Sequence, residues 1–259
     1  MPQRNIILIG GSAGALDALK VLMKNLPADV PAAVFCVLHI HPRSKDMLPH
    51  ILSKYSGVPV QQAAEGQSIA AGNVYVAPPD RHLQIGNNHI HLTHGPKEGL
   101  HRPSINVTFR SAAASYRERV IGVLLSGMLD DGASGLWDIA RQGGVTIVQD
   151  PNEALFPSMP LSALRDVPVN YSLPVEEIAP LLAKLVAGQE AEQVNQTISS
   201  NEKDANRFRG FTCPECRGPL MNIGSSRLNF DAGSGIFSRS KLSLMSTAIR
   251  KSENFTGRL

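Results

Sequence analysis

The chain has 259 residues, of which 42 % are hydrophobic, and its 25 basic and 22 acidic side chains give a net charge of +3. This length suits one large domain, or one domain with a small appendage, and so weak a net charge argues against a nucleic-acid binder. Three cysteines are too few for a disulfide framework, and no apolar stretch approaches a membrane span, so we expect a cytoplasmic protein without membrane insertion.

Apolar runs of strand length alternate with amphipathic helical patterns along most of the chain. The chain starts with M-P-Q-R-N-I-I-L-I-G-G, in which a short apolar run ends in two glycines. This pattern is typical of a first strand and not of a signal peptide. We expect strands at 5–9, 32–38, 74–77, 83–85, 90–92, 120–125 and 145–148, and helices at 16–26, 47–55, 104–116, 134–141 and 176–186. This order predicts an α/β fold, a doubly wound, mainly parallel sheet with helices on both faces and a short antiparallel hairpin.

The composition changes after this α/β pattern. Residues 1–187 form the predicted α/β domain, and residues 188–208, rich in Gln, Glu, Asn and Ser, are predicted to be a solvated linker. Residues 209–259 form a separate tail, and the segment 201–259 carries 10 basic and 5 acidic residues. Without interleaved aromatic residues, this excess of positive charge is a weak nucleic-acid signal.

Polar side chains follow three of the predicted buried strands. Ser12 lies in the turn G-G-S-A-G after the first strand, His39 follows the second, and Asp130 and Asp131 follow the strand at 120–125. In a parallel sheet these strand ends share one edge, where ligands bind. A hydroxyl, an imidazole and a carboxylate together can supply a nucleophile, a general base and the group that orients the base. Asp150, after the next strand, is a rival acid.

Each of these residues also has a simpler interpretation. Ser12 could cap a helix, or its turn could bind phosphate, although the glycine spacing departs from the dinucleotide fingerprint and the P-loop lysine is absent. His39 could be satisfied by a nearby carbonyl, or could ligate a metal together with His41. The simplest interpretation of five other histidines is as surface or hairpin residues, namely His41, His50, His89, His91 and His94.

Six ordered sequence blocks between residues 5 and 186 resemble the catalytic domain of the CheB-type chemotaxis protein-glutamate methylesterases. The blocks are I-G-G-S-A-G-A, L-H-I-H-P, A-P-P-D-R-H, H-R-P-S-I-N-V-T-F, L-S-G-M-L-D-D-G-A-S-G and Q-D-P-N-E-A-L-F-P-S-M-P. The resemblance implies a Ser-His-Asp hydrolase that removes methyl groups from glutamyl methyl esters on the cytoplasmic helices of chemoreceptors. It also implies deamidation of receptor glutamines.

Carried over by position, the resemblance makes Ser12 the nucleophile, His39 the base and Asp131 the orienting acid. Asp131 is preferred to Asp130 because it directly precedes the glycine. The backbone N–H of Met128, with that of Ala13, is expected to stabilise the oxyanion. No metal or organic cofactor is implied, and residues 1–187 become the predicted methylesterase catalytic domain.

The sequence also departs from the family pattern. Ala15 replaces a second glycine in the nucleophile turn. A phosphorylation-regulated receiver domain, present in many members, is not expected here, so a separate partner or constitutive activity would replace this regulation. The resemblance also implies a separate methyltransferase or histidine kinase system as a partner. The tail resembles a zinc ribbon that keeps only the pair Cys213 and Cys216, two of the four ligands that a closed zinc site needs. A catalytically silent module that binds receptors or signalling partners is the alternative function.

Overall fold

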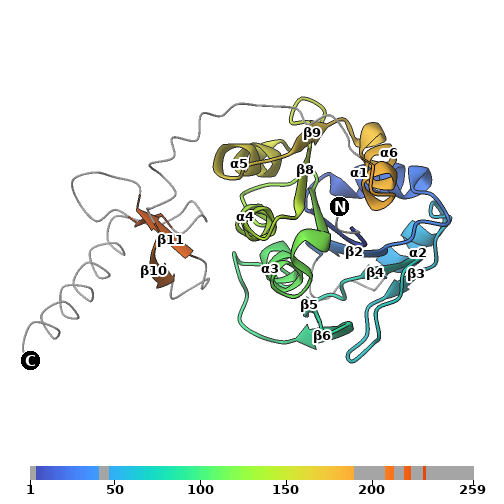
Figure 1. Cartoon of the computed structure of the whole chain (residues 1–259), viewed down its shortest axis with the longest axis horizontal. Coiled ribbons are helices and arrows are strands. Elements are labelled where there is room, and N and C mark those ends of the chain that lie inside the picture. The colour runs from blue at the N-terminus through green and yellow to red at the C-terminus, as the bar shows by residue number, and fades with distance from the viewer. Residues whose placement is uncertain (1–3, 41–46, 190–207, 213–218, 223–229, 232–259) are drawn as a thin grey trace, which may run out of the picture. The chain divides into compact units, whose positions relative to one another are not determined.

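The computed structural model describes residues 4–40, 47–189, 208–212, 219–222 and 230–231. The contacts divide the chain into two units, Met1–Gln196 and Thr197–Leu259. The first unit is the α/β domain (Figure 1). No helix in the described ranges is long and apolar enough to cross a bilayer.

The strands of the first unit alternate with helices, as the sequence patterns predict. Its strands are β1 (Ile6–Gly11), β2 (Ala33–Leu38), β3 (Val60–Gln62), β4 (Asn73–Val76), β5 (His82–Gly86), β6 (His89–Thr93), β7 (Val120–Leu124), β8 (Val145–Gln149) and β9 (Tyr171–Leu173). Its helices are α1 (Ala15–Asn25), α2 (Leu48–Ser53), α3 (Ile105–Tyr116), α4 (Ala133–Arg141), α5 (Ser158–Asp166) and α6 (Val175–Val186), with a 3₁₀ turn, Arg117–Arg119, after α3.

Seven of these strands form one parallel sheet in the order β3-β4-β2-β1-β7-β8-β9. β5 and β6 pair with each other as a separate antiparallel hairpin. The predicted doubly wound α/β fold with a short hairpin is therefore confirmed. The chain leaves β1 toward β2 on one side and returns at β7 on the other, so the switch point of the sheet lies between β1 and β7.

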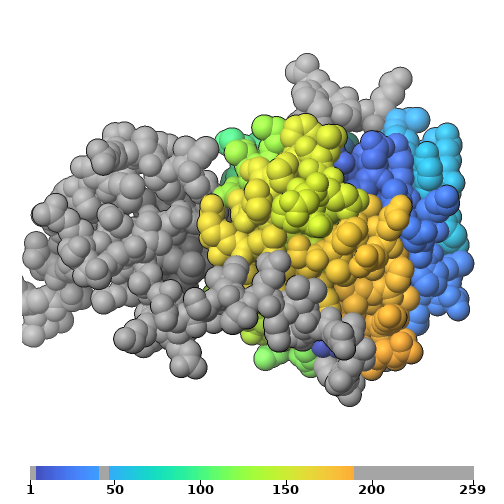
Figure 2. Space-filling view, turned by 90° about the horizontal axis from the view of Figure 1, so that it is seen from above, coloured from blue at the N-terminus to red at the C-terminus, as the bar shows by residue number. Residues whose placement is uncertain are grey.

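Two apolar cores lie on opposite faces of the sheet, because alternate side chains of a strand point to opposite faces. Ile7 and Ile9 of β1 pack with α1 and α6. Ile6 and Leu8 of the same strand pack with α3, α4 and α5. Figure 1 shows α1 and α6 together on one side of the sheet, and Figure 2 shows the orange surface of α6 beside the blue N-terminal part of the chain.

Three short elements were not predicted by the sequence patterns. β3 and β9 are three-residue strands at the two edges of the sheet, too short to show a period. α5 contains Pro160 in its first turn, where proline is tolerated because the first N–H groups of a helix have no intrahelical partner.

The second unit contains a small antiparallel sheet. Its strands β10 (Phe208–Thr212), β11 (Pro219–Asn222) and β12 (Phe230–Asp231) pair in that order. Cys213 and Cys216 lie outside the described residues, as does most of the predicted linker 188–208. The interpretation of the tail as a zinc-ribbon remnant stays a prediction.

Candidate active site

Ser12, His39 and Asp131 meet at the carboxyl edge of the sheet. Ser12 is the first residue after β1, His39 the first after β2, and Asp131 lies in the loop between β7 and α4. Since β2, β1 and β7 are neighbours in the sheet, these three connections start side by side. Gly127 permits the close approach, because a Cβ there would lie 3.0 Å from Cβ of Ser12.

The His39 imidazole bridges the other two side chains. Its Nδ1 lies 3.1 Å from Ser12 Oγ, and its Nε2 lies 2.7 Å from Asp131 Oδ2. An ionised carboxylate only accepts hydrogen bonds, so the proton belongs on Nε2. Nδ1 is then an acceptor for the Ser12 hydroxyl, which is the arrangement that a general base requires. The side chains of His39 and Asp131 are only 7 % and 2 % exposed.

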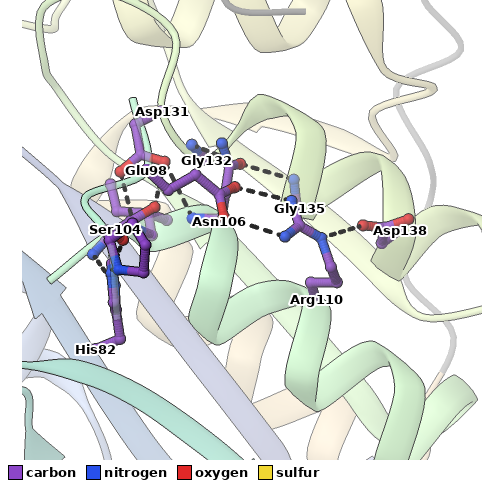
Figure 3. A network of polar contacts seen from close by, with 11 residues as sticks. His82, Glu98, Ser104, Asn106, Arg110, Asp131, Gly132, Gly135 and Asp138 are labelled. Atoms are coloured by element: carbon purple, nitrogen blue, oxygen red, sulfur yellow. Dashed lines mark hydrogen bonds and ion pairs between the residues drawn. The ribbon is translucent and has the colours of Figure 1, made fainter. Parts of the chain in front are cut away.

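The Asp131 carboxylate lies at the N-terminus of α3 and accepts four hydrogen bonds. Besides His39, it receives Ser104 Oγ at 3.0 Å and the backbone N–H groups of Ile105 at 2.8 Å and Asn106 at 3.1 Å. Figure 3 shows Asp131 next to Ser104 and Asn106. Burial raises the pKa of Asp131, but the His39 imidazole and the two N–H groups outweigh burial and hold its pKa below the ordinary value. Asp131 is therefore ionised, as an orienting acid must be.

α3 and α4 cap each other's first turns. Asp131, which precedes α4, accepts the N–H groups that begin α3, and Asn106 of α3 accepts the N–H groups of Gly132 at 2.9 Å and Gly135 at 2.8 Å (Figure 3). A Cβ at Gly135 would lie 2.5 Å from Cβ of Phe109, so glycine lets the two helices approach. This mutual capping fixes the position of the carboxylate that His39 contacts.

A second imidazole covers the face of His39. The rings of His39 and His101 are parallel within 8°, with centroids 3.6 Å apart. Burial, and secondly the charge of His39, lower the pKa of His101 below its ordinary value. The sequence patterns gave His101 and Asn106 no roles of their own, because these residues act through partners distant in the chain, and they made Ser104 only a candidate helix cap. The available signal was the block H-R-P-S-I-N itself.

Hydrogen bonds at their carbonyls hold two peptides next to Ser12, the Ser12–Ala13 peptide and the Gly127–Met128 peptide. The carbonyl of the Ser12–Ala13 peptide accepts the N–H of Ala15 at 3.1 Å, and that of the Gly127–Met128 peptide accepts the N–H of Met159 at 3.0 Å. Because N–H and C=O of a planar peptide point in opposite directions, these contacts orient the N–H groups of Ala13 and Met128. Within the described residues neither N–H donates to a backbone carbonyl.

The remaining candidates lie apart from this cluster. Asp150 accepts the N–H and side-chain amide of Asn152 and is thereby engaged in its own turn. His50, His89, His91 and His94 are exposed, and His41 lies outside the described residues. Among the residues that the structure describes, no group of three His, Cys, Asp or Glu side chains could hold a metal ion.

Comparisons with known proteins identify the family of the chain. The family model described as CheB methylesterase matches residues 7–182. A protein-glutamate methylesterase/protein-glutamine glutaminase 2 of Methanosarcina mazei is 38 % identical over 191 residues, covering 71 % of this chain but 52 % of that protein. A similarly named, putative enzyme of Leptospira interrogans is 39 % identical over 69 % of this chain and 93 % of its own length.

The solved catalytic domain of the Thermotoga maritima CheB methylesterase matches with a TM-score of 0.68 and 32 % identity, over 70 % of this chain and 98 % of that one. The match thus spans a whole catalytic domain and about half the length of the M. mazei relative. With the fold, the sequence blocks and the family model in agreement, the chain belongs to the CheB methylesterase family.

Proposed function

We propose that the protein is a serine hydrolase that removes methyl groups from glutamate methyl esters of chemoreceptors. The observation that carries this proposal is the His39 imidazole, which lies 3.1 Å from the Ser12 hydroxyl and 2.7 Å from the ionised Asp131. The names of the M. mazei and L. interrogans relatives support the substrate class, and they support hydrolysis of glutamine side chains as a second reaction.

In this proposal Ser12 Oγ attacks the ester carbonyl while Nδ1 of His39 takes its proton. Asp131 stabilises the imidazolium, and the N–H groups of Ala13 and Met128 stabilise the oxyanion of the tetrahedral intermediate. The C–OCH₃ bond breaks as His39 returns its proton to the leaving oxygen, which releases methanol. A water molecule then repeats attack and breakdown at the acyl-Ser12 ester, and the free glutamate carboxylate leaves. With a glutamine side chain, ammonia replaces methanol.

An apolar rim supports a protein substrate. Four large apolar side chains near Ser12 are exposed, namely Met128 at 55 %, Leu129 at 45 %, Leu155 at 71 % and Phe156 at 37 %. We call them the apolar rim. Leu155 and Phe156 lie against the Ser12 turn, because a Cβ at Gly14 would be within 3.0 Å of each. Exposed apolar residues grouped at a site are typical of a surface that binds the apolar side of a helix.

The test measures methanol release from methylated receptor membranes and from a small glutamate methyl ester. Ser12→Ala is expected to lower both rates by about three orders of magnitude or more, since triad members act as a unit. Ser53→Ala, which changes an exposed serine of α2, is the matched control. A fluorophosphonate is expected to label Ser12 in the wild type. Activity that survives Ser12→Ala would refute the assignment, and absence of both activity and labelling would favour a silent binding module.

The apolar rim makes a separate contribution. Leu155→Ser is expected to raise KM for receptor membranes and leave the small ester unaffected, because Leu155 is exposed and makes no contact in the Ser12–His39–Asp131 cluster. An equal effect on both substrates would show that Leu155 does not bind the receptor.

A further inference from the structure

Ser126, a buried residue two positions after the end of β7, contacts three segments around the site. It is 1 % exposed. Its N–H donates to Gln149 Oε1 at 2.9 Å, and its carbonyl accepts the Ser12 N–H at 3.0 Å. Its hydroxyl accepts the Phe156 N–H at 2.9 Å and donates to the Ala13 carbonyl at 2.9 Å. The hydroxyl therefore donates a hydrogen bond to the loop that contains Ala13 and accepts one from the loop that contains Phe156.

The contacts of Ser126 enclose the peptide that carries the Ala13 N–H. The Ser126 carbonyl holds the peptide before Ser12, and the Ser126 hydroxyl holds the carbonyl of the peptide after Ala13. The Ser12–Ala13 peptide lies between these two. Because each peptide is planar and only two dihedrals per residue are soft, fixing both neighbours leaves the Ala13 N–H little freedom. Loss of the hydroxyl would release the constraint on the peptide after Ala13 and leave the Ser12 N–H and the Ser12 carbonyl held.

The same hydroxyl reaches the second N–H group through Phe156. The Phe156 carbonyl accepts the Gly127 N–H at 2.9 Å, and the Met159 N–H donates to the Gly127 carbonyl at 3.0 Å. The segment 156–159 thus holds Gly127 on both sides, and the Gly127–Met128 peptide carries the Met128 N–H. By binding the Phe156 N–H, the Ser126 hydroxyl connects this segment to the Ser12 turn.

We propose that Ser126 is a positioning residue whose hydroxyl holds the backbone N–H groups of Ala13 and Met128 at one fixed separation, so that both bind the same oxyanion. The proposal rests on the hydrolase function argued above. Ser126 touches neither substrate nor reacting atoms; it acts through Ala13 and Phe156. Donors that are fixed in advance stabilise a transition-state charge without reorganisation, and small displacements weaken that effect.

Ser126→Ala is expected to lower kcat for a small methyl ester by about 10- to 100-fold, with KM nearly unchanged. Loss of a whole oxyanion donor costs about 10² to 10³ in kcat, and misplacement of two donors costs less than their removal. KM is spared because the ground-state carbonyl depends less on these donors than the oxyanion does.

A thionoester substrate separates positioning of the oxyanion donors from a general structural role. Sulfur is larger and accepts hydrogen bonds weakly, so an intact pair of donors makes the wild type hydrolyse the oxygen ester much faster than the matched thionoester. Ser126→Ala is expected to reduce this rate ratio by up to the fold-change seen in kcat for the oxygen ester. Ser126→Thr keeps the hydroxyl and is expected to restore the ratio, while Ser126→Cys, a weak donor, is expected to be intermediate and covers the case in which Ser126→Ala does not fold.

Thr146→Val is the matched control. The buried Thr146 hydroxyl also accepts one backbone N–H, from Asn170, and donates to one carbonyl, of Pro168, each at 3.0 Å. It joins β8 to the segment before β9, away from Ser12. Thr146→Val is expected to lower the melting temperature and leave the rate ratio unchanged.

Two outcomes distinguish failure of this proposal from failure of the proposed function. A wild type without Ser12-dependent esterase activity would overturn the hydrolase function and this assignment with it. An active wild type in which Ser126→Ala lowers the oxygen-ester and thionoester rates equally, or lowers neither, would overturn the role of Ser126 alone.

Discussion

Replacing Asp131 by asparagine tests how the carboxylate controls the His39 tautomer. The four groups that contact Asp131 all act as donors: Nε2 of His39, the N–H groups of Ile105 and Asn106, and the Ser104 hydroxyl. Asparagine has the same shape but turns one oxygen into an NH₂ donor. In either orientation of the amide, at least one backbone N–H then faces another donor.

The two orientations have different consequences for His39. With NH₂ at the Oδ2 position, Nε2 must accept, the proton moves to Nδ1, and the imidazole can no longer take the proton of Ser12. With NH₂ at the Oδ1 position, the Ser104 hydroxyl can turn to accept and Nε2 keeps its proton, but the negative charge that stabilises the imidazolium is gone. We expect kcat to fall by about 10³- to 10⁴-fold, the size of effect seen when a triad aspartate becomes asparagine.

Asp131→Asn is expected to lower the free energy of unfolding by less than it raises the activation free energy of the reaction. One buried N–H left without an acceptor costs about 1–3 kcal/mol, which urea unfolding resolves. Rates are measured by methanol release, with Asp150→Asn as control. Asp150 follows the neighbouring strand, and among the described residues its carboxylate binds only Asn152 of its own turn. An Asp131→Asn protein within threefold of the wild-type rate would refute the tautomer argument, as would an equal loss in Asp150→Asn.

Three other changes have expected outcomes. Gly14→Ala should lower both stability, by about 1 kcal/mol or more, and esterase rate, because Gly14 has φ 74° and a Cβ there would lie 2.9 Å from Ser126 Oγ; an unchanged melting temperature would contradict this. Since the pKa of His101 is lowered in the folded state, the unfolded chain binds more protons than the folded chain between that lowered pKa and about pH 6.5, and stability rises with pH across this window. His101→Phe should flatten that rise in urea unfolding between about pH 5 and 7, and an identical slope would exclude the effect. A chain ending at Gly188 should unfold cooperatively and keep activity on a small ester, and a chelator should leave the melting of the full chain unchanged; a large chelator-induced drop would reveal metal ligands in the tail.

Local sequence patterns were sufficient to predict most strands of the sheet and the polar residues that follow them. Ala33–Leu38 and Val120–Leu124 are continuous apolar strands buried on both faces, and such runs are typical of parallel sheets. Once the strands are parallel, Ser12, His39 and the Asp130–Asp131 pair must come to one edge. The choice between Asp130 and Asp131 came from the family resemblance and not from the strand pattern.

Local sequence patterns could not predict the contacts between segments that are distant in the chain. Ser126 resembles any small residue after a strand, and only the folded chain shows that its hydroxyl joins Ala13 to Phe156. The stacking of His101 on His39 likewise depends on the path of the loop before α3. Edge strands such as β3 were missed because three half-exposed residues carry no readable period.

The switch point between β1 and β7 has a consequence for how the protein refolds. Ile6 of β1 pairs with Ala33 of β2 on one side and with Val120 of β7 on the other. The first pairing closes a short loop of chain, and the second closes a loop several times longer. Pairings between distant segments form slowly, because the entropy of the closed chain is lost before the contact is gained. Ser12 and His39 belong to the early side and Asp131 to the late one. Recovery of esterase activity after dilution from denaturant should therefore follow the β1–β7 pairing, and lag behind the formation of helices.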